Sequence, residues 1–304
     1  MNRDSIDHDL LVYDSDEQYA EHLVPFFEAG FDRGEALVAV PGRATEPMVR
    51  EALGRVSERV TIHACEDWYT RPEAALAGYD AATRAFLRDG AAGVRVFAEL
   101  PFCSSPREWS RWVRYEAIIN RAFAGRPVTL MCTCDSRVLH EHMLDEMFHT
   151  HPHVVSGERQ ENPDYHDPAE VVRRFEPEPE PLPELHDVPV GDARTFRGAL
   201  ARELADAGVA PDHAEAMILA AGEVVVNAGR HGDGLRTLRV GGSEGSFVCE
   251  VSDTGPGLDD PLAGWVPPGA PAGNGGGLWV ARQLTRRLDL LPSPDGGLTV
   301  RLWT

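Results

Sequence analysis

The most informative absence from this sequence of 304 residues is lysine, because all 29 of its basic residues are arginine. P-loop ATPases and ordinary protein kinases hold nucleotide phosphates with a lysine, so the sequence excludes both classes. Acidic residues also outnumber the arginines, and the formal charge is −20. Since binding to nucleic acid or to an anionic membrane surface requires positive charge, we expect no nucleic acid and no membrane as partners.

Cysteine and long apolar runs are scarce as well. Five unevenly spaced cysteines in a chain of this size indicate reduced thiols rather than a disulfide framework. No apolar run reaches the roughly 18 residues that a membrane span needs. The polar, acidic stretch 1–9 does not have the pattern of a signal peptide. These absences together predict a cytoplasmic protein.

A stretch rich in proline and glutamate separates two parts of the chain, each long enough to form a domain. Residues 176–184 read Glu-Pro-Glu-Pro-Glu-Pro-Leu-Pro-Glu. This composition favours an extended, self-repelling segment, which we interpret as a solvated, semi-rigid linker. The predicted domains are therefore residues 1–175 and 191–304, with a linker at 176–190.

Strand and helix signals alternate through the first domain. Short apolar runs predict strands, and the amphipathic stretches between them predict helices. Such alternation is typical of a parallel sheet with helices on both faces, a doubly wound α/β fold. The predicted strands are residues 8–14, 36–40, 60–64, 94–100 and 128–132, and the predicted helices are residues 17–30, 46–53, 72–87, 108–123 and 137–148.

In doubly wound folds, ligands bind at the carboxyl ends of the strands. Those ends carry Pro41–Arg43, Cys65–Trp68, Glu99 and Cys132–Asp135 in this sequence. No phosphate loop of the lysine-containing type follows any of these strands.

Cysteine and histidine residues cluster near the end of the first domain, and both types bind zinc. Their spacing matches no zinc motif, and two of the cysteines fall on one face of a strand, where small core residues are the simpler interpretation. Glu116, next to Tyr115 on a predicted helix, is likewise interpreted as part of an internal polar pair. Packing is thus preferred, with metal binding as the alternative. The cluster comprises Cys132, Cys134, His140, His149, His151 and His153.

The second domain contains a predicted helix that carries two polar residues one turn apart. Apolar residues at helical spacing predict a helix from Ala214 to Val226. Glu223 and Asn227 are four residues apart and therefore project from one face. An acid and an amide on an apolar helix need a polar partner. The alternative is a helix end that frays into solvent, with Asn227 and Gly229 as stop signals.

Two glycine-rich elements follow. The predicted strand 248–252 ends in Asp253-Thr-Gly255-Pro-Gly257, where glycines allow backbone to approach a flat ligand and Asp253 can accept a hydrogen bond from its amine. The stretch Gly273-Asn-Gly275-Gly-Gly277 opens a predicted helix through Leu288, and a helix N-terminus suits phosphate. Residues 258–272, between them, are interpreted either as a lid or as a surface loop.

These three elements, in this order, resemble the nucleotide site of the GHKL superfamily, which contains the gyrase, histidine-kinase and MutL ATPases. The anti-sigma-factor serine kinases are the most similar group. The resemblance covers residues 192–304 and implies a two-layer α/β sandwich, with helices on one face of a mixed sheet, that binds ATP and Mg²⁺. It implies that Glu223 is the general base and Asn227 the Mg²⁺ ligand. The cofactor-binding residues that it implies are Asn227, His231, Asp253, Gly255, Gly257, Gly273, Gly275, Gly277 and Leu278.

The first domain resembles the MEDS sensory domain, a degenerate relative of the RecA-like ATPases. The resemblance covers residues 8–168 and implies a sensor of small organic molecules. It rests on His8, on Tyr115-Glu116 with Asn120, on Cys132–Arg137, on His151-Pro152 and on Asn162–Pro168.

Together the resemblances imply an anti-sigma regulator that responds to a signal. It would phosphorylate a serine of a small anti-anti-sigma (STAS-type) protein, with a sigma factor as competing partner, and such kinases commonly form homodimers. Two alternatives stay open. Gly276 stands where the family often carries arginine, which leaves open a nucleotide-dependent module that sequesters a partner without phosphorylating it. His140-Glu141 is a possible phosphoacceptor start, which would indicate a sensor histidine kinase.

Overall fold

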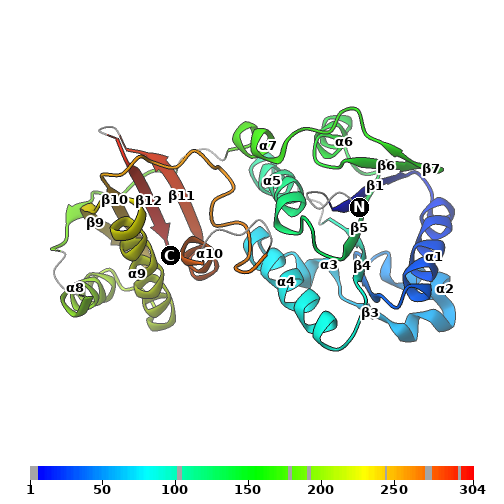
Figure 1. Cartoon of the computed structure of the whole chain (residues 1–304), viewed down its shortest axis with the longest axis horizontal. Helices are drawn as coiled ribbons and strands as arrows, with labels where there is room; N and C mark the ends of the chain where they lie inside the picture. Colours follow the sequence, from blue (N-terminus) through cyan, green and yellow to red (C-terminus); the bar gives the residue numbers. More distant parts are fainter. Residues whose placement is uncertain are drawn as a thin grey trace. The chain divides into compact units, whose positions relative to one another are not determined.

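The structure is a computed structural model that describes residues 6–100, 105–176, 180–189, 193–243, 245–270, 276–293 and 296–304. The chain divides into two compact units, the first of residues 1–177 and the second of most of residues 178–304. Each unit has its own sheet (Figure 1). Within the described ranges, no helix has both the length and the apolar composition required to cross a membrane.

The first unit is built on a seven-stranded sheet in the order β3-β2-β4-β5-β1-β6-β7. Neighbouring strands from β3 to β6 run parallel, and β7 pairs antiparallel with β6 at the edge. The strands are β1 (Asp7–Tyr13), β2 (Ala36–Val40), β3 (Val60–Ile62), β4 (Val94–Glu99), β5 (Val128–Asp135), β6 (His153–Ser156) and β7 (Glu158–Glu161).

Helices cover both faces of this sheet (Figure 1). Leu10 and Leu11 are adjacent in β1 and both fully buried, yet they lie in different core clusters, because successive strand residues point to opposite faces. One cluster packs against α1 and α2, and the other against α5, α6 and α7. The helices are α1 (Asp16–Asp32), α2 (Glu46–Leu53), α3 (Cys65–Trp68), α4 (Pro72–Arg88), α5 (Pro106–Ala122), α6 (Glu141–Phe148) and α7 (Pro168–Arg174), with a 3₁₀ turn, η1 (Gly54–Arg59).

The predicted doubly wound α/β fold is therefore confirmed. The hairpin of β6 and β7 was not predicted, because its strands have four residues each and β7 is entirely exposed. Pairing of β6 with the buried strand β1 decides its conformation, and a short polar segment carries no local signal for that.

The second unit is a five-stranded sheet, in the order β11-β12-β10-β9-β8, packed against helices. Alternate residues Phe247, Cys249 and Val251 of β10 are buried in a shared core with Leu200 and Leu204 of α8, as expected for a sheet with one face covered. The elements are α8 (Ala193–Asp206), α9 (Pro211–His231), α10 (Gly277–Leu284), β8 (His186–Asp187), β9 (Leu235–Ser243), β10 (Ser246–Asp253), β11 (Arg287–Pro292) and β12 (Leu298–Trp303).

The predicted two-layer α/β sandwich is confirmed, with three corrections. All strand pairs described in this sheet are antiparallel, so it is not the mixed sheet that we expected. The helix with Glu223 continues to His231, so the interpretation of a helix end at Asn227 and Gly229 is wrong. The helix after the second glycine element ends at Leu284, because Leu288 pairs with Leu302 in the sheet.

The end of the predicted linker is docked on the second unit instead of being solvated. Glu180 forms ion pairs with Arg286 at 2.8 Å and with Arg287 at 3.4 Å. Farther along, β8 pairs with β9 and the side chain of Val188 is buried. The interpretation of 176–190 as a mere spacer is thus wrong for residues 180–189, because backbone pairing and opposite charge fix them to the sheet.

We expect Leu200→Ala to lower the free energy of unfolding of the second unit by about 2–5 kcal/mol, because a fully buried leucine leaves a cavity when truncated. Leu219 of α9 is 50% exposed, so Leu219→Ala is the matched control and should cost less than about 1 kcal/mol. Urea unfolding followed by circular dichroism measures both. Equal losses in the two variants would contradict the core described above.

Candidate functional site

The polar face of α9 meets the first residue of α10. Glu223 is exposed and Asn227 is half-buried, one helical turn apart. A Cβ on Gly277 would lie 2.7 Å from Asn227 Nδ2 and 3.1 Å from Glu223 Oε2. A side chain on the first residue of α10 would therefore displace the polar ends of Asn227 and Glu223 from their present positions. The three residues, which are separated by up to 54 positions in sequence (277 − 223), form one polar surface.

The N-terminus of α10 supplies hydrogen-bond donors at that surface. Gly276 precedes the helix, and no described side chain caps it. The first amides of an α-helix have no carbonyl partner within the helix, and the helix dipole makes this end attractive to anions. The Leu278 side chain packs against the core, which anchors the turn. Gly273 and Gly275, which the sequence also places here, lie outside the described residues.

The other end of the site is organised around Asp253, at the end of β10. Its Oδ1 accepts hydrogen bonds from the amides of Gly255 at 3.1 Å and Leu298 at 2.9 Å. Its Oδ2 faces the end of α9, where a Cβ on Gly232 would lie 2.4 Å away. Because the two amides hold Oδ1, the orientation of the carboxylate is fixed, and Oδ2 keeps lone pairs to accept a ligand amine.

Backbone from the end of α9 packs against the first glycine element. A Cβ on Gly255 would lie 2.6 Å from the Cα of Gly232 and 3.1 Å from the carbonyl oxygen of His231. The His231 side chain is exposed. Gly257 has a φ of +83°, which favours glycine. The structure thus brings together the described members of the predicted site, whereas sequence reasoning missed Gly232, whose only signal was its position just after the helix.

The segment between the glycine elements, described as far as residue 270, is packed against α10 around Trp265. Trp265 is buried, and the guanidinium of Arg282 lies 4.4 Å from its ring centroid. Arg282 also donates hydrogen bonds to the carbonyl oxygen of Ala263 at 3.2 and 3.3 Å. A Cβ on Gly264 would lie 2.7 Å from Cβ of Leu278. The interpretation as a loose surface loop is therefore wrong for these residues, which are tied to α10.

Comparison with known proteins assigns both units. Residues 7–152 match the MEDS family, described as MEthanogen/methylotroph, DcmR Sensory domain. Residues 189–303 match the histidine kinase-like ATPase domain family. The chain is a fusion of these two domains. None of the curated proteins compared with it matches.

A MEDS domain joined to a histidine-kinase-like ATPase domain supports an ATP-binding regulator that is controlled by a signal. The donor set of the ATPase site fits ATP with Mg²⁺. It offers a carboxylate for the adenine amine, an amide oxygen and a carboxylate beside each other, and a helix N-terminus for phosphate.

In the MEDS domain, most of the predicted carboxyl-end residues lie together. The amide of Gly42 donates to Glu99 Oε2 at 2.9 Å, and the amide of Arg43 donates to Glu66 Oε1 at 3.1 Å. Burial raises the pKa of Glu99, and its Oε1 has no hydrogen-bond partner among the described residues. Asp135, by contrast, pairs with Arg137 at 2.8 Å.

A separate hollow of about 700 Å³ lies at the opposite, amino ends of the strands. The sequence motifs indicated a site only at the carboxyl ends of the strands, so this hollow was not predicted. The residues that line it come from several separate elements and share no sequence motif. Its lining includes Asp7, Asp9, His22, Arg95, Thr129 and Arg159.

The predicted cysteine and histidine cluster does not assemble as one group. His140 is exposed at the start of α6, and His149 packs edge-on against His166 with ring centroids 4.7 Å apart. Cys134 is buried among apolar side chains, as the packing interpretation predicts. Only Cys132 and His151 come together, and they do so with two residues from distant parts of the domain.

We expect Gly232→Ala to weaken ATP binding at least about 10-fold, because the new methyl would occupy space taken by the Asp253 carboxylate. Gly229→Ala is the matched control. Gly229 lies in the last turns of α9, and a Cβ there would meet no described neighbouring atom within 4 Å. This variant should leave binding unchanged and stabilise the helix slightly. Calorimetric titration with Mg-ATP measures both. Normal binding by Gly232→Ala would show that Asp253 is not part of the nucleotide site.

Proposed function

We propose that this protein is a signal-controlled serine kinase. It binds Mg-ATP and phosphorylates a serine of a small anti-anti-sigma (STAS-type) protein, and a sigma factor competes for the same domain. The observation that carries the proposal is the position of Glu223. Its carboxylate is exposed beside the N-terminus of α10 and one turn from Asn227, where an incoming hydroxyl and a terminal phosphate would meet.

The roles of the residues follow from this geometry. Asp253 would accept a hydrogen bond from the adenine amine, and the amides at the start of α10 would hold the phosphates. Bound Mg²⁺, with Asn227 Oδ1 as its protein ligand, would neutralise phosphate charge. Glu223 would take the proton from the serine Oγ as Oγ bonds to the γ-phosphorus. The bond from that phosphorus to the β,γ-bridging oxygen then breaks, and ADP leaves.

A kinase without lysine needs other positive electrostatic potential at the phosphates. Here the dipole and free amides of α10 supply it, and the short approach of Gly277 to Asn227 keeps these donors close to the metal ligand. This explains how a strongly acidic chain with no lysine can bind a triphosphate.

A histidine-kinase function is less well supported. His140 precedes the eight-residue helix α6, and Met143 and Met147 of that helix are buried in the MEDS domain core. A phosphoacceptor histidine requires a long helical hairpin, and the described part of the MEDS domain contains none around His140.

We expect Asp253→Asn to lower the affinity for Mg-ATP at least about 10-fold, because an amide in this position presents a donor or a weaker acceptor to the adenine amine. Tryptophan fluorescence is a suitable readout, since Trp265 and Trp279 are buried next to the site. Asp212→Asn, in the exposed first turn of α9, is the control and should bind as the wild type does. If neither wild-type fluorescence nor calorimetry detects ATP binding, the proposal fails.

We expect Glu223→Gln to bind Mg-ATP normally and to transfer phosphate 10²–10⁴-fold more slowly, the typical contribution of a general base. Glu215→Gln, exposed two turns earlier on α9, should transfer at the wild-type rate. The assay follows radiolabel from ATP into purified STAS-type proteins. The label should survive acid and be lost in alkali, as phosphoserine is.

Other outcomes assign the alternatives. An acid-labile label would indicate phosphohistidine and contradict the serine kinase. Nucleotide-dependent capture of a sigma factor without transfer, by the wild type and by Glu223→Gln alike, would show a sequestering module.

A further inference from the structure

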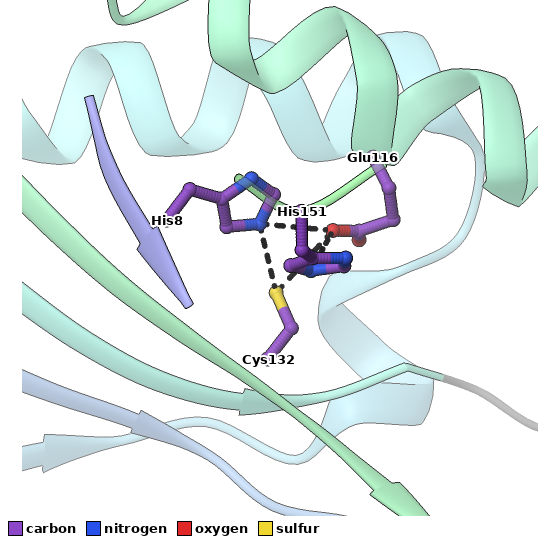
Figure 2. A group of neighbouring side chains, drawn as sticks. All are labelled: His8, Glu116, Cys132 and His151. Carbon is purple, nitrogen blue, oxygen red and sulfur yellow. Dashed lines mark hydrogen bonds and ion pairs between the residues drawn. The ribbon is translucent and has the colours of Figure 1, made fainter. Parts of the chain in front are cut away.

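Four ionisable side chains from separate elements converge inside the MEDS domain (Figure 2). His8 comes from β1, Glu116 from α5 and Cys132 from β5, and His151 lies two residues before the start of β6. Three of them are 0% exposed and Cys132 is 4% exposed. Each offers one ligand atom, and these four atoms all lie within 4.8 Å of one another.

The separations have the size of a metal coordination shell. His8 Nε2 lies 3.2 Å from Glu116 Oε2 and 3.3 Å from Cys132 Sγ. Glu116 Oε2 lies 3.3 Å from Cys132 Sγ and 3.4 Å from His151 Nε2. In a tetrahedral zinc site with bonds of about 2.0–2.3 Å, neighbouring ligand atoms are roughly 3.3–3.8 Å apart. The four side chains therefore need little movement to surround one ion.

The surroundings of His8 fix which of its nitrogens is free. Asn120 Nδ2 donates to the carbonyl oxygens of Thr150 at 2.8 Å and Glu116 at 3.2 Å, so its Oδ1 must face His8 Nδ1, at 3.1 Å. Since that oxygen can only accept, Nδ1 carries the proton. In the neutral ring, the lone pair of Nε2 then points toward Glu116 and Cys132.

His151 has the same arrangement. Its Nδ1 lies 2.9 Å from the carbonyl oxygen of Met147, which is an acceptor only, so Nδ1 carries the proton. Its Nε2 has no hydrogen-bond partner among the described residues, and neither does the buried Glu116 Oε1. The two Nε2 atoms thus face the Glu116 carboxylate and the Cys132 thiol inside the domain.

We propose that His8, Glu116, Cys132 and His151 form a tetrahedral site for a zinc-like divalent transition-metal ion. The ligand atoms are the two Nε2 atoms, Glu116 Oε2 and Cys132 Sγ as a thiolate, whose proton is released to solvent on binding. One thiolate and one carboxylate balance the charge of a divalent ion, so the buried site is neutral overall, which limits its desolvation cost.

The ligand set also indicates the type of ion. Thiolate and imidazole select zinc and similar transition metals over Mg²⁺ and Ca²⁺, which prefer oxygen. Four protein ligands with no exposed member are typical of a structural site. Asn120 and the Met147 carbonyl are the outer-shell partners that orient the two imidazoles. The ion would link β1, α5, β5 and the start of β6.

The test uses the full-length protein, treated with a chelator, dialysed and titrated with Co²⁺ and then Zn²⁺. We expect one ion per chain, the visible spectrum of tetrahedral Co²⁺ with a thiolate-to-cobalt charge-transfer band, and displacement of Co²⁺ by Zn²⁺. Cys132→Ser should abolish that band and weaken binding by more than the roughly 10–100-fold loss typical of an outer-shell change. Cys134→Ser is the matched control, being buried on the same strand outside the group, and should bind as the wild type does.

Two further measurements keep the result decisive if Cys132→Ser does not fold. Asn120→Ala should bind about 10–100-fold more weakly, through loss of the His8 partner. Zn²⁺ should also raise the temperature at which the MEDS domain unfolds in the full-length wild-type protein, because binding stabilises only the folded state. The proposal is overturned if the wild type binds no ion, if its Co²⁺ spectrum lacks the thiolate band, or if His140→Ala rather than Cys132→Ser removes the bound ion.

Discussion

The ATPase domain depends on close approach between backbone and polar side chains. Gly277 lies against Asn227 and Glu223, Gly232 lies against Asp253, and Gly255 lies against the end of α9. At each contact a Cβ would crowd a neighbouring atom, so this arrangement of the site depends on the absence of side chains there. This constraint places three segments around one polar surface.

The absence of lysine gives this arrangement its functional importance. In a chain with a formal charge of −20, the phosphates of a nucleotide would be repelled by the surface as a whole. The N-terminus of α10 offers local positive potential that does not depend on a basic side chain. The segment 258–270 adds a second support, because Arg282 holds it to α10 through the Ala263 carbonyl and the Trp265 ring. A change in the conformation of this segment would therefore act directly on α10, whose N-terminus forms the phosphate end of the site.

The MEDS domain is governed by a different constraint, the burial of ionisable groups. Its interior contains Glu116 with two histidines, and Glu99 beside Gly42. Such groups are costly to bury unless charge and hydrogen bonds are satisfied. Glu116 Oε1 and His151 Nε2 have no hydrogen-bond partner among the described residues. A bound cation would compensate for their burial, and it would make the folding of the sensory domain depend on the same ion. The hollow at the amino ends of the strands is a separate feature of the domain.

The sequence by itself determined most of the order of elements, because the apolar periods of 2 and 3.6 residues and the Pro/Glu-rich stretch are local features. It also determined the three motifs of the ATPase site, since Glu223, Asn227 and Asp253 stand in fixed local contexts. Only the tertiary structure decided that residues 186–187 join the second sheet, that Gly232 faces Asp253, and that His8 and Glu116 meet Cys132 and His151. His8 and His151 are separated by 143 positions (151 − 8). Spacing along the chain cannot reveal such a group, because parallel strand pairing and helix packing bring its members together.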